Sequence, residues 1–584
     1  MRRDDPALPY AEVGLTDEAA AAHALNRLGY GPRPGEAVAV AERGVEDWIA
    51  EQLAALRPDA DLDRRLAGFD YLGMDAEAVA TTFVPPNYAL QIAVARGDLP
   101  SGFTPRDAEI RDRLDAWMAR EGFRHIRDLR NDVVQAKLIR AVHAQSQLRE
   151  VLTDLWYNHF NVDARGQAIS FVASYERDAI RPHVLGRFRD LLGATARHPA
   201  MLQYLDNSRS RAPSGTATTF GRAPGQGGLN ENYGRELLEL HTLGVDGGYS
   251  QADVLAAARA FTGWTVTPVR GREDAIERQL QNLERLERRG ETGIVREGLF
   301  LFRPNWHDAE PKTLLGQTLP GGRGIEDGED VLDLLAAHPA TARHIGRTLA
   351  IRFVDDNPSD DLVDRLADVY RRTDGDLGAV MAALVRDEAF WASATSGPEG
   401  APSKVKTPFE YVASAARATA APITEIRGIA RALRNMGEPV FHAEPPTGFP
   451  DHAEAWVNAG LLLTRMNLGL RLASGRLRGA RPDLDALTGG RQPESVDAAL
   501  DTYIRTLLPG RDPAPTVELL QPIVREPAFA RRVAEAAGEA EARTPMALDD
   551  DGVFEADEPV PFDADDTAAF VVGVVLGSPS FQRQ

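Results

Sequence analysis

The chain has 584 residues, no cysteine and a formal net charge of −21 at pH 7. It is longer than one hydrophobic core usually supports, so we expect two or three packed subdomains. The acidic balance disfavours nucleic acid and anionic membrane surfaces as partners, and the lack of cysteine excludes disulfides, thiolate metal sites and a cysteine nucleophile.

Helical patterns dominate in chain order. Thr16 is a cap residue ahead of an apolar stretch at 19–28, which Gly29 ends. Further amphipathic segments follow at 138–159, 180–192, 252–262, 329–337, 341–353, 359–370, 377–389, 408–420 and 461–472. Strand-like alternation is scarce and is clearest at 298–302. We therefore predict a mostly α, multi-helix fold with at most short β-hairpins.

We divide the chain into three helical subdomains, at 1–200, 201–400 and 401–584. The second contains a densely charged segment at 270–296, which we interpret as a solvated helical insertion. The third contains an acidic segment at 549–566, which we interpret as an irregular surface segment because it lacks the spacing and the glycine of an EF-hand.

The start of the chain indicates its compartment only in part. Residues 1–6 are followed by no apolar region of a secretory leader. We expect a cytoplasmic protein from the chain as given, and a periplasmic or envelope protein if a leader has been removed. No apolar run, including 571–576, is long enough for an integral membrane segment.

The segment 230–244 concentrates acids, amides, an arginine and a histidine on one predicted helix. It follows a Gly-, Ser- and Pro-rich loop at 208–228. One face carries Asn232, Arg235, Glu236 and Glu239, because residues three and four apart share a face. A capped helix with ordinary ion pairs would also explain this pattern.

Two other clusters combine aromatic and titratable groups. Trp156, Asn158 and His159 belong to one, and a satisfied buried helix end is the alternative to a stacking or proton-transfer role. His307 and Asp308 form the other, with Lys312 nearby; an aspartate beside a histidine can fix its tautomer. Trp264 is a further aromatic candidate, although core or cleft-wall tryptophans are commoner.

Standard catalytic motifs are absent from the sequence. There is no HExxH, GxSxG, Walker A or strand-bound GxGxxG motif, and no Glu-x-x-His pair of a di-iron bundle. A metal site would need distant ligands, such as Glu236 or Glu239 with His159 or His307. The sequence assigns no cofactor and no metal.

The chain resembles the bacterial DUF1800 family, a group of undetermined function. The resemblance rests on HALNRLGYG from His23, the Trp156–Phe160 cluster and the NENYGRELLELHTLG block from Asn230. It extends through further short motifs, which include Phe261–Trp264, His307-Asp308, His338–Ala342, Lys406–Pro408 and Ser578–Gln582. The family implies an association with DUF1501-like proteins, which resemble sulfatases and alkaline phosphatases, and often an exported location. It implies no catalytic residue.

Our first hypothesis is a hydrolase that acts on a glycan or another cell-envelope polymer. Its catalytic candidates are Glu236, Glu239, His307, Asp308 and His159. Its substrate-binding candidates are Trp156, Asn158, Asn232, Arg235, Trp264 and Lys312. The alternatives are a non-catalytic envelope partner or assembly factor for a DUF1501-like protein, and a His/Glu metal-dependent oxidoreductase. The deciding feature is whether Glu236, Glu239, His159 and His307 converge on one solvent-reachable pocket. If they are dispersed, or if each is satisfied by its own ion pair, both enzyme hypotheses fail for these residues.

Overall fold

The computed structural model describes residues 7–54, 58–165, 168–219, 221–223, 228–269, 281–285, 288, 292–526 and 566–584. The predicted acidic segment lies outside these residues except for Asp566. Most of the charged insertion also lies outside them, and residues 281–285 of it are helical.

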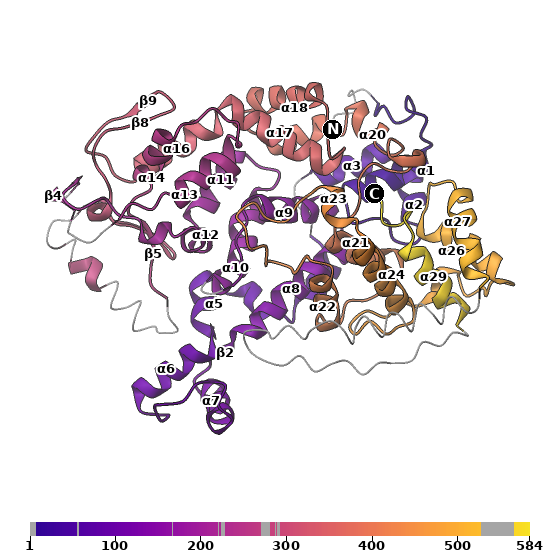
Figure 1. Ribbon diagram of the computed structural model, residues 1–584, viewed down its shortest axis with the longest axis horizontal. Coiled ribbons are helices and arrows are strands. Elements are labelled where there is room, and N and C mark those ends of the chain that lie inside the picture. Colours follow the sequence, from indigo (N-terminus) through magenta and orange to yellow (C-terminus); the bar gives the residue numbers. More distant parts are fainter. Residues whose placement is uncertain are drawn as a thin grey trace.

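The fold is mostly α, with a few short strands (Figure 1). The α-helices are α1 (Asp17–Arg27), α2 (Glu36–Arg43), α3 (Val45–Leu53), α4 (Ala60–Leu66), α5 (Ala76–Thr82), α6 (Pro86–Arg96), α7 (Ala108–Arg120), α8 (Ile126–His143), α9 (Gln147–His159), α10 (Ile169–Ser174), α11 (Phe188–Arg197), α12 (Pro199–Tyr204), α13 (Asn232–Glu236), α14 (Gln251–Ala260), α16 (Glu326–Ala336), α17 (Pro339–Phe353), α18 (Asp360–Arg372), α19 (Leu377–Leu384), α20 (Glu388–Ala392), α21 (Pro408–Ala418), α22 (Arg427–Asn435), α23 (Ala453–Trp456), α24 (Ala459–Ala473), α25 (Leu484–Leu487), α26 (Val496–Leu507), α27 (Ala514–Val524) and α29 (Thr567–Gly577). Two π-helices, η2 (Tyr175–Ile180) and η5 (Leu237–Thr242), continue α10 and α13. The 3₁₀ helices are η1 (Asp70–Gly73), η3 (Arg181–His183), η4 (Asn207–Arg209), η6 (Pro304–Trp306) and η7 (Pro398–Gly400).

The strands form four small sheets. They are β1 (Phe83–Val84) with β2 (Arg124–His125), β3 (Ala217–Thr218) with β4 (Gly221–Arg222), β8 (Lys312–Leu314) with β9 (Gln317–Leu319), and the three-stranded sheet of β5 (Trp264–Val266), β7 (Phe300–Phe302) and β6 (Val295–Glu297). Only the β1–β2 pair is parallel. The predicted strand at 298–302 appears as β7, the central strand of its sheet.

Local capping chemistry sets many of the helix boundaries. Thr16 caps α1 through the amide of Ala19, as the sequence predicts. Thr407 and Glu410 form a capping box at the start of α21. His198 and His338 each cap a helix with an imidazole nitrogen and are followed by a proline at the first helical position.

One hydrophobic core cluster runs through most of the molecule, with members from Leu8 to Phe581. It includes residues of all three predicted subdomains, whose boundaries near 200 and 400 remain a prediction. Helices α6 and α7 have a separate small core around Trp117 and project from the main body (Figure 1). The N-terminal helices α1–α3 lie beside C-terminal segments, and Arg417 of α21 donates to the carbonyl of Gly31.

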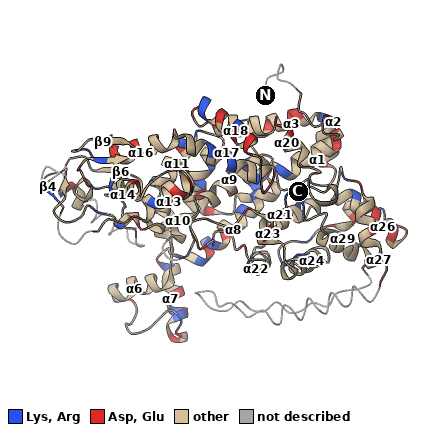
Figure 2. Ribbon diagram, turned by 45° about the horizontal axis from the view of Figure 1, so that its top comes forward, with Lys and Arg blue, Asp and Glu red and all other residues tan. Residues whose placement is uncertain are grey.

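The apolar helix α29 is buried against α24 and α26. Gly469 and Gly573 allow close approach of α24 and α29, since a Cβ at Gly469 would lie 2.9 Å from the Gly573 carbonyl oxygen. Among the described residues, no helix is both long and apolar enough to cross a bilayer. The surface helices carry mixed charges (Figure 2), and Arg347 of α17 is 2.6 Å from Asp360 of α18.

Candidate functional site

The 230–244 segment does not continue as a regular α-helix. Helix α13 gives way after Glu236 to the π-helix η5. The Oδ1 of Asn230 accepts from the amide of Asn232 at the start, and Arg235 pairs with Glu231 at 3.4 Å, as the i,i+4 spacing predicts. π-Helical turns are rare in proteins, and many of those that occur lie at functional sites. The strongest sequence motif therefore has an unusual backbone.

Three histidines meet on the packed side of η5, namely His241 of η5 itself, His159 of α9 and His344 of α17. His159 Nε2 is 3.1 Å from the carbonyl oxygen of His241, and His344 Nε2 is 3.1 Å from that of Leu240. The ring centroids of His159 and His344 are 5.7 Å apart. Burial, together with the neighbouring imidazoles, lowers the pKa of His241 to about 3 and that of His159 well below its usual value. The cluster is therefore neutral at pH 7.

Glu236 and Glu239 lie on the other side of this segment and are half-buried. Glu239 accepts from the hydroxyl of Tyr249 at 3.2 Å. Burial and the charge of Glu239 raise the pKa of Glu236. Arg235 donates to Gln251 at 3.0 Å besides its pair with Glu231, and Asn232 is exposed.

His307 and Lys312 meet in a second, fully buried cluster around Asp327. The carboxylate of Asp327 is 2.5 Å from Lys312 Nζ and 3.3 Å from His307 Nε2. Burial acts to raise the pKa of Asp327, but the bonds from His307 and Lys312 outweigh it and lower that pKa. Asp308 is paired instead with Arg259 at 2.7 Å. These side chains are all 2% exposed or less except Arg259, so this cluster is closed to substrate in this conformation.

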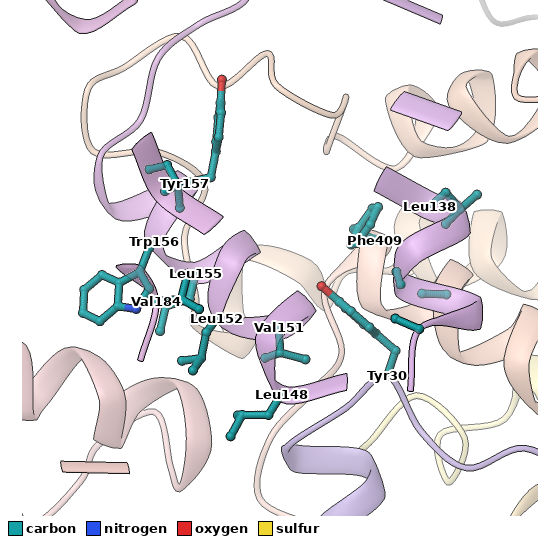
Figure 3. Close-up of a cluster of buried hydrophobic side chains, with 14 of the residues drawn as sticks. Tyr30, Leu138, Leu148, Val151, Leu152, Leu155, Trp156, Tyr157, Val184 and Phe409 are labelled. Atoms are coloured by element: carbon teal, nitrogen blue, oxygen red, sulfur yellow. The ribbon is translucent and has the colours of Figure 1, made fainter. Parts of the chain in front are cut away.

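The two predicted stacking tryptophans are both core residues. Trp156 and Trp264 are 0% exposed, and their indole nitrogens have no hydrogen-bond partner among the described residues. Trp156 projects from α9 beside Val184, whereas its neighbour Tyr157 leaves α9 in another direction (Figure 3). Neither indole presents a face to a substrate.

Asn158 is the predicted site residue that lines a cavity. The cavity has a volume of about 60 Å³ and is formed by α8, α9, α17, α21 and the loop at 438–451. Its ionisable lining residues are Lys137, Asp154, Arg352, Glu410, Glu438 and Asp451. Its aromatic lining residues are Tyr157, Phe409, Phe441 and Phe449. The side chains of Asp154 and Asp451 are 35% and 26% exposed, so the cavity reaches solvent.

Ion pairs organise the walls of this cavity. Lys137 Nζ lies 2.8 Å from Asp154 and 3.0 Å from Glu176. Burial acts to lower the pKa of Lys137, but these two carboxylates outweigh it and raise that pKa. Arg352 is paired with Glu410, whose Oε2 also accepts from the amide of Thr407 at 2.8 Å. The capping box of α21 thereby holds Glu410, and with it Arg352, in place at the cavity wall.

Glu438 is the exceptional carboxyl group of the cavity. It is 8% exposed, and its Oε2 accepts from the amide of Phe409 at 2.7 Å. Burial and the charge of Asp154 raise the pKa of Glu438 to about 8. Burial also raises the pKa of Asp451. At pH 7 the cavity thus combines a largely protonated acid with salt-bridged carboxylates.

The sequence-predicted candidates lie in separate places: His159 by η5, His307 and Lys312 in the Asp327 cluster, and Asn158 at the cavity. Sequence reasoning missed Lys137, Asp154, Arg352, Glu438 and Asp451. Two signals lay near them: the capping box at Thr407 and the Pro- and Gly-rich run at 445–450. Neither identifies a charged cavity without the packing.

Among the described residues, no group of three or more histidines and carboxylates is arranged to hold a metal ion. Residues 23–583 match the protein family described as "Protein of unknown function (DUF1800)". No curated protein and no solved structure matches the chain. The match covers nearly all of the sequence, including every cluster described above. The chain therefore belongs to the DUF1800 family of proteins of unknown function.

Proposed function

We propose that the protein is a hydrolase that acts on a glycan or another cell-envelope polymer at the cavity beside Asn158. The sequence-predicted catalytic residues do not converge, so the proposal rests on two other carboxyl groups, Glu438 and Asp154, which both line one solvent-reachable cavity. Two carboxyl groups in different environments can divide the acid and base roles of a hydrolysis.

Glu438 is the general acid in this proposal. Its pKa of about 8 keeps it largely protonated at pH 7, so it can transfer a proton to the leaving oxygen as the bond breaks. The amide of Phe409 holds its Oε2 and so orients the carboxyl group. Mobility of the acid would lower the fraction of productive encounters.

Asp154 is the general base. It forms a salt bridge with Lys137, and its partial exposure gives water access to it. It takes the proton of an attacking water, whose oxygen bonds to the carbon that loses the leaving group. After the reaction Glu438 regains a proton from solvent, and Asp154 releases to solvent the proton that it took from the water.

In this proposal the aromatic rings contact the substrate, whereas Asn158 holds the wall of the cavity in place. Tyr157, Phe409 and Phe441 give the cavity apolar faces of the kind that pack against sugar rings. Asn158 holds the backbone of Phe449 through its side-chain amide. Asn158 is therefore a positioning residue for the cavity wall.

The test is a measurement of new reducing ends from solubilised peptidoglycan, chitosan and a neutral β-glucan with the full chain. We expect release by the wild type and a loss of about 100-fold or more in Glu438→Gln, the usual scale for an acid catalyst. Activity should fall as pH rises through about 8, because Glu438 must be protonated. The control is Glu454→Gln, which removes an exposed carboxylate of α23.

Two outcomes would overturn this assignment. If Glu438→Gln keeps full activity and Glu236→Gln or Glu239→Gln loses it, the acids are those of the 230–244 segment, as the sequence suggested. If the wild type releases nothing from any polymer, the hydrolase proposal fails and the non-catalytic envelope partner is favoured. The geometry of the described residues gives the metal-dependent oxidoreductase no comparable support.

A further inference from the structure

Arg352 has a buried hydrogen-bond donor that finds no acceptor in the described part of the chain. The residue is 6% exposed and lines the cavity, and its Nη2 is paired with Glu410. Its Nη1 is buried and has no hydrogen-bond partner among the described residues. A buried guanidinium N–H without an acceptor costs free energy, so a ligand oxygen at this point would be stabilising.

The charges around the cavity favour a cationic ligand. The cations that line it are Lys137 and Arg352, and the carboxyl groups that line it are Asp154, Glu410, Glu438 and Asp451. With Glu438 protonated, three carboxylates face two cations, a balance of −1. The charged groups bonded behind this lining are the carboxylates of Glu150, Glu176 and Asp356 and the cations Arg181 and Lys404, and they add one further negative charge. An anionic ligand would add to this excess, whereas an ammonium group would reduce it.

The cavity already stabilises one ammonium group, that of Lys137. Its Nζ lies 4.9 Å from the ring centroid of Phe441, 5.5 Å from that of Tyr157 and 5.7 Å from that of Phe409. Aromatic faces attract cations through the ring quadrupole, and carboxylates add charge-assisted hydrogen bonds. The lining is therefore chemically suited to a second ammonium group near the partly exposed Asp451.

The volume limits how much of a ligand enters. A cavity of about 60 Å³ holds only a few water molecules, so one edge of a sugar ring would enter it and the rest of a polymer would lie outside. The cavity favours an edge that carries an ammonium group for its carboxylates and an oxygen acceptor for Arg352. An amino group beside a ring hydroxyl supplies both.

We infer that the cavity recognises an amino sugar whose nitrogen is unacylated, with its ammonium group at Asp451 and a neighbouring hydroxyl oxygen at Arg352 Nη1. The inference rests on the proposed function and names its substrate class. An N-acetyl group would remove the charge and add a bulky acyl group. A neutral sugar would leave the carboxylate excess uncompensated.

Calorimetric titration of the full chain at pH 7 tests the inference with glucosamine, N-acetylglucosamine, glucose and glycinamide. We expect glucosamine to bind at least about tenfold more tightly than the two neutral sugars, the effect of roughly one charge-assisted hydrogen bond. Asp451→Asn should reduce this preference, whereas Glu454→Gln should leave it unchanged. The thermal melting curve of each variant reports whether it is folded.

Equal affinity for glucosamine and the neutral sugars overturns the inference, and so does the absence of glucosamine binding. Tighter binding of glycinamide than of glucosamine also overturns it and assigns the cavity to the amino end of a peptide. The polymer assay distinguishes the two proposals. If glucosamine binds but no polymer is hydrolysed, the amino-sugar site is supported and the hydrolase proposal is rejected. If neutral glucan is hydrolysed and glucosamine is not preferred, the hydrolase proposal is supported and the amino-sugar site is rejected.

Discussion

Asn158 and Phe449 are joined by two reciprocal hydrogen bonds across 291 residues of sequence. Asn158 Nδ2 donates to the carbonyl of Phe449 at 2.8 Å, and the amide of Phe449 donates to Asn158 Oδ1 at 2.7 Å. The side-chain amide of Asn158 thus satisfies both the N–H and the C=O of Phe449, as a neighbouring β-strand would. The last turn of α9 is thereby attached to the loop that carries Asp451.

Asn158→Ala removes both bonds and leaves the Phe449 backbone groups without these partners. We expect the free energy of unfolding to fall by about 1–3 kcal/mol, because partly buried polar groups lose their hydrogen bonds. Urea unfolding measures the change. The control is Asn357→Ala at an exposed position, which should stay within about 0.5 kcal/mol of the wild type. An equal effect of the two substitutions would contradict a special role for Asn158.

Gly448→Ala tests how closely the loop approaches α9. Gly448 has φ +71°, and a Cβ there would lie 2.4 Å from Asn158 Oδ1. The substitution should destabilise the protein by more than the roughly 1 kcal/mol of left-handed backbone strain alone. Gly437→Ala separates the two effects, since Gly437 has φ +87° but its nearest neighbour would be 3.9 Å away. Similar melting temperatures for both variants would argue against the close contact.

Glu438 should make the protein less stable as pH rises. Its pKa is about 8 in the folded chain and 4.5 as the reference value, so the folded state binds more protons between these limits. The stabilising contribution is complete below pH 4.5 and is lost as pH rises toward 8. This difference in pKa corresponds to a few kcal/mol in the free energy of unfolding, at about 1.4 kcal/mol per pKa unit.

In Glu438→Gln this pH dependence should be absent, while Glu454→Gln should keep it. Urea unfolding at pH 5, 7 and 9 gives the comparison. A wild-type free energy of unfolding that rises steadily from pH 5 to 9, with the same slope in Glu438→Gln, would show that Glu438 ionises normally in the folded protein.

The histidine cluster should make the protein sensitive to acid. The pKa of His241 is lowered to about 3, so below pH 6.5 the unfolded state binds a proton that the folded state does not. Its stabilising contribution is complete above pH 6.5 and is lost as pH falls toward 3. His23 and His198, whose pKa values are also about 3, act in the same direction.

His241→Phe should reduce this slope by about one proton, or 1.4 kcal/mol per pH unit, between pH 6 and 4. The larger ring should itself cost on the order of 1–2 kcal/mol at pH 8. His452→Gln, at an exposed histidine, is the control. Stability curves of wild type and His241→Phe that run parallel from pH 8 to 4 would refute the contribution of His241.

Sequence periodicity and capping chemistry predicted the mostly α fold because both are local. Thr16 and the Glu231–Arg235 pair behave as their spacing requires. The 3.6-residue period does not indicate a π-turn, so the change of helix type after Glu236 was not foreseen. The family motif drew attention to Asn158, which lines the cavity, but Glu438 and Arg352 are single charged residues whose partners lie far away in the sequence. Only the packing of α17, α21 and the 438–451 loop reveals their common cavity.

The π-helical segment at 237–242 also has a consequence for how its motif tolerates length changes. A turn closed by i→i+5 bonds contains one residue more than an α-helical turn, and each residue rotates an α-helix by about 100°. Removing one residue here would let an unbroken α-helix form and would turn Gly244, which faces His344, relative to Glu236. Single-residue deletions within 237–242 should therefore be far more harmful than conservative substitutions at the same positions. The structure of this motif therefore depends on the number of its residues as well as on their identities.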